Sequence, residues 1–225
     1  MDPMPVPAYV VDHIFICTAV GALAAELLRQ AGLTEGTPNR HPGQGTACRR
    51  FFFSNAMLEL LWLEDEVEAR SEQTRATKLW ERFAATRTVS PFGVILRPAP
   101  RTEPVCPWRS WSYRPPSMPG LELEIATGTE MNEPMWCFMK TGRPPADWPP
   151  ERLQPLDHPA GFRELTNVLI NCPDVNDTSV TRAMALNGVI ALQTGLEHLL
   201  ELQFDRGCRK NAHDFRPALP LILRA

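Results

Sequence analysis

A histidine and a glutamate stand among apolar residues at two places where the sequence predicts strands. His13 lies in Tyr9–Cys17 (YVVDHIFIC), and Glu59 lies in Met57–Leu63 (MLELLWL). A buried, ionised carboxylate is costly unless a metal ion, a donor group or cavity water satisfies it. Imidazole and carboxylate groups from two strands of one curved sheet could supply half of a divalent-metal site. The alternative is a neutral His13 bonded to a polar neighbour, with Glu59 at the solvated rim.

The segment RHPGQGT (residues 40–46) is a second candidate for chemistry. Proline after His41 favours an extended entry, and the two glycines permit close backbone approaches. The segment could cover a pocket, with His41 or Arg40 facing a ligand carbonyl or carboxylate. It could equally be a tight connection whose histidine caps a turn. Arg49 and Arg50 follow on opposite faces of the next strand, and we expect both to be exposed.

Composition excludes several classes of function. The 225 residues are 44% hydrophobic and 22% charged with a net charge of −3, which is ordinary for a globular chain and gives no basic footprint for nucleic acid or an anionic membrane. The sequence has no uncharged apolar run of about eighteen residues, so we expect no membrane span. The six cysteines are scattered, which predicts buried free thiols and a cytoplasmic protein. Phosphate-loop, serine-hydrolase and zinc-protease motifs do not occur.

The first of three blocks reads as strand, helix and further strands. Residues 9–17 form the first strand, in which His13 would share a face with its neighbours two and four positions away. Residues 19–31 have helical spacing and end at a glycine. Residues 46–53 and 57–63 are the next strands, and 34–40 could pair with them.

The second block, residues 66–142, contains one predicted amphipathic helix at 75–86. Strands are expected at 92–97, 121–126 and 135–140. The chain has 23 prolines, with dense groups at 98–119 and 144–159. Because proline lacks the amide donor of helices and central strands, both groups should be loops or edge segments.

The third block, residues 162–225, repeats the order strand, helix, strands. Its strands are predicted at 165–171, 189–193, 198–204 and 219–223, and its helix should begin at Asp177 or Thr178 and end near residues 187–188. It looks like an internal repeat of the first block, with 164–172 matching 9–17 and 199–207 matching 57–65.

Three strings of the first block together resemble a known family. VDHIFICT, RHPGQGTACRRFFF and MLELLWLED resemble the glyoxalase-like domain of the vicinal oxygen chelate superfamily, which includes glyoxalases, extradiol dioxygenases and bleomycin-resistance proteins. The resemblance is strongest over residues 11–65. It implies βαβββ modules whose curved sheets enclose a cleft. In metal-using members a divalent ion in that cleft chelates vicinal substrate oxygens and acts as a Lewis acid. His13 and Glu59 fall on the ligand positions of the first and fourth strands.

The same resemblance exposes two departures. The last strand of the second module tends to supply a glutamate in related sequences, whereas Phe138 stands at that position here. In the third block the counterparts of His13 and Glu59 are Asn167 and Glu201. The donor set for a tightly held metal is therefore incomplete on this alignment.

The sequence thus predicts an α+β protein with paired βαβββ modules and curved mixed sheets around a cleft. The expected units are residues 9–65, the degenerate 66–142, and a C-terminal strand–helix–strands module at 162–225. The resemblance allows a homodimer, and a small molecule is the expected partner, without nucleic acid or membrane.

Two function hypotheses follow. In the first, the protein is a lyase- or isomerase-like enzyme for a small oxygenated substrate, in which His13 and Glu59 hold one divalent ion (Mn, Fe, Ni or Zn) and His41 is a catalytic proton carrier beside Glu59. In the second, it sequesters a small molecule without catalysis or metal, as bleomycin-resistance proteins do. The cleft is then lined by Phe15, Trp62, Trp136 and similar residues, and His13 and Glu59 pair only with each other. Arg40 is a further candidate for contact with the bound molecule.

Overall fold

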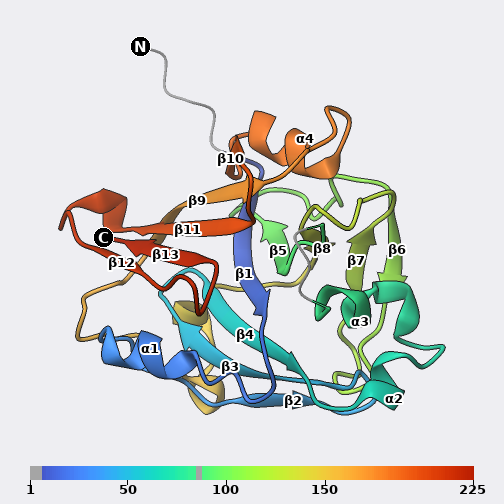
Figure 1. The fold of residues 1–225 in the computed structure, drawn as a ribbon, viewed down its shortest axis with the longest axis horizontal. Coiled ribbons are helices and arrows are strands. Elements are labelled where there is room, and N and C mark those ends of the chain that lie inside the picture. Colours follow the sequence, from blue (N-terminus) through green and yellow to red (C-terminus); the bar gives the residue numbers. More distant parts are fainter. Residues whose placement is uncertain (1–6, 85–87) are drawn as a thin grey trace.

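The protein has an α+β fold built from two mixed sheets with few, short helices (Figure 1). The structure, a computed structural model, describes residues 7–84 and 88–225. Within these residues, eight strands form the first sheet in the order β2-β3-β4-β1-β5-β8-β7-β6. Five strands form the second sheet in the order β10-β9-β11-β13-β12.

The first sheet joins two halves of similar topology. The first half comprises β1 (Tyr9–Cys17), α1 (Ala25–Gln30), β2 (Asn39–His41), β3 (Thr46–Phe52) and β4 (Met57–Leu63). After the short helices α2 (Glu66–Ala69), η1 (Arg75–Thr77) and α3 (Leu79–Arg82), the second half comprises β5 (Phe92–Pro98), β6 (Ser110–Tyr113), β7 (Leu123–Ala126) and β8 (Met135–Phe138). Strand β1 pairs in parallel with β4, β5 pairs in parallel with β8, and β1 and β5 join the halves antiparallel. The second half has no helix between β5 and β6, in a stretch that the structure describes throughout.

The C-terminal unit is a reduced copy of the whole first sheet. After the turns η2 (Pro145–Asp147) and η3 (Pro150–Arg152) come β9 (Leu165–Cys172), α4 (Val180–Leu186), β10 (Ala191–Thr194), β11 (Leu199–Phe204), η4 (Asp205–Gly207), β12 (Ala212–Asp214) and β13 (Leu221–Arg224). Strand β9 pairs in parallel with β10 and antiparallel with β11, which pairs in parallel with β13. By this pairing β9 corresponds to β1, as the sequence repeat predicted. The counterpart of β4 is β10, however, so the predicted match of 199–207 with 57–65 is wrong.

One hydrophobic core joins the two sheets, so the C-terminal unit shares its interior with the first sheet. Ile14, Leu60 and Phe138 from the first sheet belong to the same buried cluster as Ile170 and Leu202 from the second. Figure 1 shows the C-terminal strands, coloured orange to red, as a group apart from the green strands β5–β8. The opposite face of the first sheet carries a smaller, separate apolar cluster. That face remains free for a site.

Two predicted helices are shorter in the structure. The expected helix over 19–31 begins only at Ala25, because Gly21 and Ala22 adopt positive φ values of 78° and 45° that no α-helix contains. The expected helix over 75–86 is divided at Lys78, whose φ is 55°. Its last two residues lie outside the described ranges. Strands β6 and β12 were not predicted.

A β-bulge interrupts the first strand and changes which residues share a face. Val11 lies opposite Leu96, His13 lies opposite Ile95, and Asp12 is the extra residue between them. Strict alternation had placed Tyr9 and Val11 on the face of His13. They instead pack against the core between the sheets, because the additional residue shifts the alternation by one position.

Candidate functional site

The free face of the first sheet holds a cavity of about 710 Å³. A volume of this size accommodates a drug-sized organic molecule. Strands from both halves of the sheet form its floor, and both proline-rich segments contribute walls. Its polar lining residues are Asp12, His13, Asn39, His41, Gln44, Arg50, Glu59, Tyr113, Thr141, Arg143 and Arg152.

His13 and Glu59 lie in this one cavity, as the sequence predicted. Strands β1 and β4 run in parallel with His13 opposite Met57 and Phe15 opposite Glu59. The two residues are therefore one pleat apart on neighbouring strands and face the same side. The bulge adds Asp12 to the same lining, a residue that alternation had assigned to the other face.

Asp12 orients the His13 ring. Its Oδ1 atom lies 2.8 Å from Nδ1 of His13, and its Oδ2 atom forms an ion pair with Nε of Arg97 at 3.3 Å. With Nδ1 held by the carboxylate, Nε2 is the ring atom left for a ligand. Burial opposes protonation of His13, but the hydrogen bond that its ring donates to Asp12 and the charge of Glu59 outweigh burial and raise the pKa of His13. Asp12 and Glu59 thus favour the protonated form of His13.

Glu59 is a buried carboxylate with little compensation from the protein. It is 8% exposed, and the thiol of Cys48 is its hydrogen-bonding neighbour. Within the described residues no N–H or hydroxyl group donates to it. A carboxylate in this position can accept a proton or a hydrogen bond from a molecule in the cavity.

Arg50 also faces the cavity, contrary to the expectation that both Arg49 and Arg50 are exposed. In the β3–β4 pairing Arg50 lies directly opposite Glu59. Its Nε–H group donates to the carbonyl oxygen of Thr37 at 2.8 Å, and its guanidinium carbon lies 5.1 Å from the centroid of the Phe52 ring. Pairing of the two predicted strands in this register, with Arg50 opposite Glu59, would have identified Arg50 as a cavity residue.

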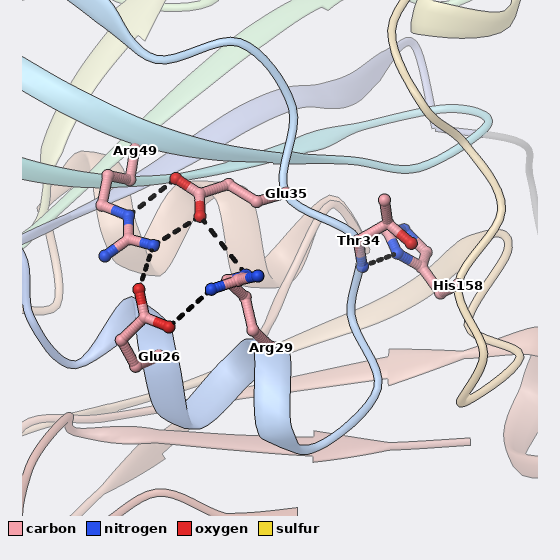
Figure 2. Close-up of polar contacts among 6 residues, drawn as sticks. All are labelled: Glu26, Arg29, Thr34, Glu35, Arg49 and His158. Atoms are coloured by element: carbon pink, nitrogen blue, oxygen red, sulfur yellow. Dashed lines mark hydrogen bonds and ion pairs between the residues drawn. The ribbon is translucent and has the colours of Figure 1, made fainter.

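Arg49 projects from the other face of β3, where it joins a surface ion-pair network. Figure 2 shows its guanidinium between the carboxylates of Glu26 on α1 and Glu35, with Arg29 completing the group. The same figure shows His158, whose Nδ1 accepts from the amide of Thr34 at 2.9 Å. These contacts fix α1 and the following loop to the sheet, away from the cavity.

His41 belongs to a chain of hydrogen bonds and is not an open acid or base. Its Nε2 lies 3.0 Å from Nδ2 of Asn39, and its Nδ1 lies 2.9 Å from Oγ1 of Thr46. Gln44 donates to the same Thr46 oxygen and accepts from the hydroxyl of Tyr113 at 3.0 Å. Burial lowers the pKa of His41, so the neutral ring is favoured. His41 lines the cavity as predicted, but its expected role as a proton carrier lacks a free ring nitrogen.

The turn after His41 is fixed from beneath by Glu68. One oxygen of that carboxylate accepts the amides of Gly43 at 2.6 Å and Gly45 at 3.1 Å. Gly45 has a φ of 74°, and a Cβ atom there would lie 2.1 Å from the carbonyl oxygen of Asp65. Only glycine fits this position, and the turn thereby holds His41 and Gln44 in the cavity wall.

Three residues predicted to contact a ligand lie outside the cavity lining. Arg40 is exposed and forms an ion pair with Glu64 at 3.0 Å. Trp62 packs against the core between the sheets, because it is one residue out of phase with Glu59. Trp136 is fully buried in that same core. These three expectations are corrected.

Phe138 also lies in the core between the sheets. In β8 it is Met135 and Cys137 that line the cavity, with Met139 just beyond the strand. The residue at the cavity position of this strand is therefore Cys137 rather than Phe138. Cys137 is a buried thiol, and burial raises its pKa to about 12.

The remaining cavity floor is apolar and rich in methionine. Phe15 lies across Gly93, where a Cβ atom would come within 2.0 Å of its ring. The absence of a side chain at position 93 therefore allows the ring to lie on the sheet. Thioether side chains adapt to ligands of varied shape. The apolar lining residues are Phe15, Met57, Leu61, Leu79, Ile95, Met118, Leu121, Leu123, Met135, Cys137 and Met139.

Both proline-rich segments are walls of the cavity. Pro115 and Pro119 contribute from the first segment, and Pro149 with Trp148 from the second. Gly142 allows the second wall to approach β1, since a Cβ atom there would lie 2.7 Å from Oδ2 of Asp12. These prolines lie in loops, which confirms the prediction from sequence. The sequence did not predict that the loops would line the cavity.

The cavity does not present a complete metal site. Across residues 7–84 and 88–225, no group of three or more histidine, cysteine or acidic side chains is arranged to hold a metal ion. His13 and Glu59 could supply two donors, fewer than the three or more protein ligands of the usual tightly bound sites. The residues therefore fit poorly with a tightly held ion.

All six cysteines have free thiols, as their spacing predicted. The expected burial holds for Cys48, Cys137 and Cys172 but is wrong for Cys208, which is exposed. None of the helices in the described part of the chain is both long and apolar enough to cross a bilayer.

Comparison with known proteins adds a fold relationship. No protein-family model and no curated protein matches the sequence. Among solved structures, the crystal structure of a hypothetical protein from Staphylococcus aureus is similar, with a TM-score of 0.54 and 9% sequence identity over 96% of this chain and 98% of that chain. At this identity the similarity concerns the fold alone. It shows that the two-sheet arrangement recurs over almost the whole length of both chains.

Proposed function

We propose that the protein binds a small, oxygenated and partly apolar organic molecule in the 710 Å³ cavity. One observation carries the proposal: an imidazole and a carboxylate converge at one side of a cavity whose remaining floor is apolar. Such a cavity orients a ligand, since its apolar body and its oxygen atoms prefer different walls.

The chemistry that these residues favour is proton transfer. With its pKa raised, His13 can donate a hydrogen bond or a proton from Nε2 to a carbonyl oxygen. Glu59 can accept the proton from the neighbouring carbon. Return of the proton at another position gives an isomerisation, and loss of a leaving group gives a lyase reaction. The glyoxalase-like resemblance supports the same reaction class, and no step requires a metal.

A non-catalytic binding protein is the second candidate. The methionine-rich lining, with Met57, Met118, Met135 and Met139, favours it because such surfaces accommodate many ligands. In this alternative Asp12, His13 and Glu59 serve only to hydrogen-bond the ligand.

Binding is tested with the fluorescent neutral probe N-phenyl-1-naphthylamine. Leu123 lines the cavity and is half-buried, so Leu123→Trp should fill part of the cavity and weaken binding at least about tenfold. Leu196 is 85% exposed, and Leu196→Trp is the matched control that should leave binding unchanged. Equal binding by both variants would show that the probe occupies another place and would refute the proposal.

Catalysis is tested separately, by hydrogen–deuterium exchange. Carbonyl compounds that displace the probe are incubated with the protein in D₂O, and exchange at the carbon next to the carbonyl is followed by proton NMR. His13→Gln and Glu59→Gln should each abolish the exchange. Exchange at the rate of the protein-free blank would favour the binding protein. Metal content after dialysis against Mn²⁺ or Zn²⁺, compared with His13→Ala, tests the metal hypothesis: stoichiometric metal lost in the variant would support it.

A further inference from the structure

The cavity lining includes three arginines: Arg50 on β3, Arg152 in the second proline-rich segment and Arg143 immediately before that segment. Within the described residues none of the three forms an ion pair with a carboxylate. By contrast, Arg49, the residue before Arg50 in the chain, forms ion pairs with Glu26 and Glu35. The contrast marks the three cavity arginines as cations with unused binding capacity.

Arg50 has an acidic neighbour and does not pair with it. It lies opposite Glu59 across β3 and β4, where oppositely charged side chains usually interact. Its Nε–H is instead directed to the Thr37 carbonyl, and its guanidinium lies over the Phe52 ring. The terminal amino groups of Arg50 therefore remain for a molecule in the cavity, because a guanidinium has five N–H donors.

Two aromatic rings connect Arg50 with the second segment. The rings of Phe52 and Trp148 meet edge to face, with centroids 5.5 Å apart. The guanidinium carbon of Arg152 lies 4.7 Å from the centroid of Trp148. The Trp148 Nε1–H group donates to the carbonyl oxygen of Arg143 at 3.1 Å, which closes the segment around the ring. A stacked guanidinium keeps the in-plane N–H groups that bind carboxylate or phosphate oxygens.

The acidic residues of the cavity do not neutralise this cluster. Asp12 is committed to His13 and to Arg97. Glu59 is the other acidic residue in the lining, and it is not paired with Arg50. The wall made by Arg50, Trp148 and Arg152 is therefore electropositive, and it lies beside methionine side chains of the lining.

We infer that the ligand is an amphipathic organic anion, whose anionic group binds this arginine wall and whose apolar body lies along the methionine-rich floor. This inference rests on the proposed function of the cavity. Arg50 and Glu59 are direct cross-strand neighbours. An anionic group bound by Arg50 therefore places the next carbon atoms of the ligand beside Glu59 and His13. The substrate class is thus an acid whose reacting carbon lies close to its anionic group.

The test compares two fluorescent probes with the same apolar body. 8-Anilinonaphthalene-1-sulfonate carries one negative charge, whereas N-phenyl-1-naphthylamine is its uncharged counterpart. Wild-type protein should bind the sulfonate at least about tenfold more tightly, the gain expected from one charge-assisted hydrogen bond. Arg50→Gln and Arg152→Gln should each remove most of that preference and leave the affinity for the neutral probe unchanged. Arg152 is exposed, so its variant remains informative if Arg50→Gln is unstable.

Arg40→Gln is the matched control, because Arg40 is an exposed arginine outside the cavity lining. It should bind both probes as the wild type does. Equal affinity of the wild type for the two probes would overturn the anionic ligand and leave the cavity proposal intact. Insensitivity of both probes to Leu123→Trp would instead refute the cavity itself. If folded Arg50→Gln and Arg152→Gln proteins lose affinity for both probes, the arginines only shape the cavity. That result would also overturn the inference.

Discussion

Replacing Thr181 by valine should destabilise the protein through the indole of Trp136. The indole Nε1–H donates to Oγ1 of Thr181 at 2.9 Å, and both side chains have 0% exposure. Valine has nearly the same shape as threonine but accepts no hydrogen bond. It leaves a buried N–H group unsatisfied, which costs about 1–3 kcal/mol in the free energy of unfolding. For a chain of this length that corresponds to a loss of about 2–4 °C in Tm per kcal/mol.

The measurement is urea unfolding followed by circular dichroism, arranged as a double-mutant cycle. In a Trp136→Phe background the donor is absent, so Thr181→Val should cost less than about 0.5 kcal/mol. The difference between the two backgrounds then isolates the hydrogen bond between β8 and α4. If Thr181→Val costs the same in both backgrounds, or nothing in the wild type, the indole is not held in the core as described.

Three further outcomes are expected. Asp12→Asn should lower the pKa of His13, which NMR titration of the ring protons measures. A raised pKa in the folded state stabilises the protein at pH values below the ordinary histidine pKa near 6.5, and this stabilisation is lost as pH rises through the folded-state pKa. Asp12→Asn should therefore reduce stability more at about pH 6 than at about pH 8, and an unchanged His13 titration would contradict the prediction. Gly93→Ala places a methyl group 2.0 Å from the Phe15 ring, so it should cost about 1–3 kcal/mol in urea unfolding and displace the ring from the cavity floor; wild-type stability would refute the close approach. Arg49→Met should lower the free energy of unfolding by about 1 kcal/mol, because it removes the ion pairs with Glu26 and Glu35. Added salt should reduce this loss in urea unfolding, and a loss that does not depend on salt would indicate packing instead.

Local pattern predicted the strands that surround the site. Residues 9–17 and 57–63 form strands with the predicted bounds, because runs of apolar and β-branched residues favour a pleated, buried surface. That His13 and Glu59 share a cavity was therefore predictable from their strands alone. The fold class followed from the same patterns.

The errors arose where one residue changes the phase or where packing decides. No local signal in the sequence marked the bulge at Asp12. Tyr9 and Val11 were therefore assigned to the face of His13, although they lie on the opposite face of the strand. The tryptophans at 62 and 136 were assigned to the cleft by residue type, although alternation from Glu59 already placed Trp62 on the other face. The contribution of Arg50 depended on cross-strand register, which no single strand reveals.

The prolines of the two cavity walls bear on the cost of ligand binding. A segment with fixed φ angles samples fewer conformations before any ligand arrives, so less chain entropy is lost when it closes around one. The second wall is built from two single 3₁₀ turns, η2 and η3, rather than from strands of the sheet. Its length and side chains can therefore vary while the β-framework beneath stays constant. Proteins that share this scaffold are free to diverge in the molecules they accept.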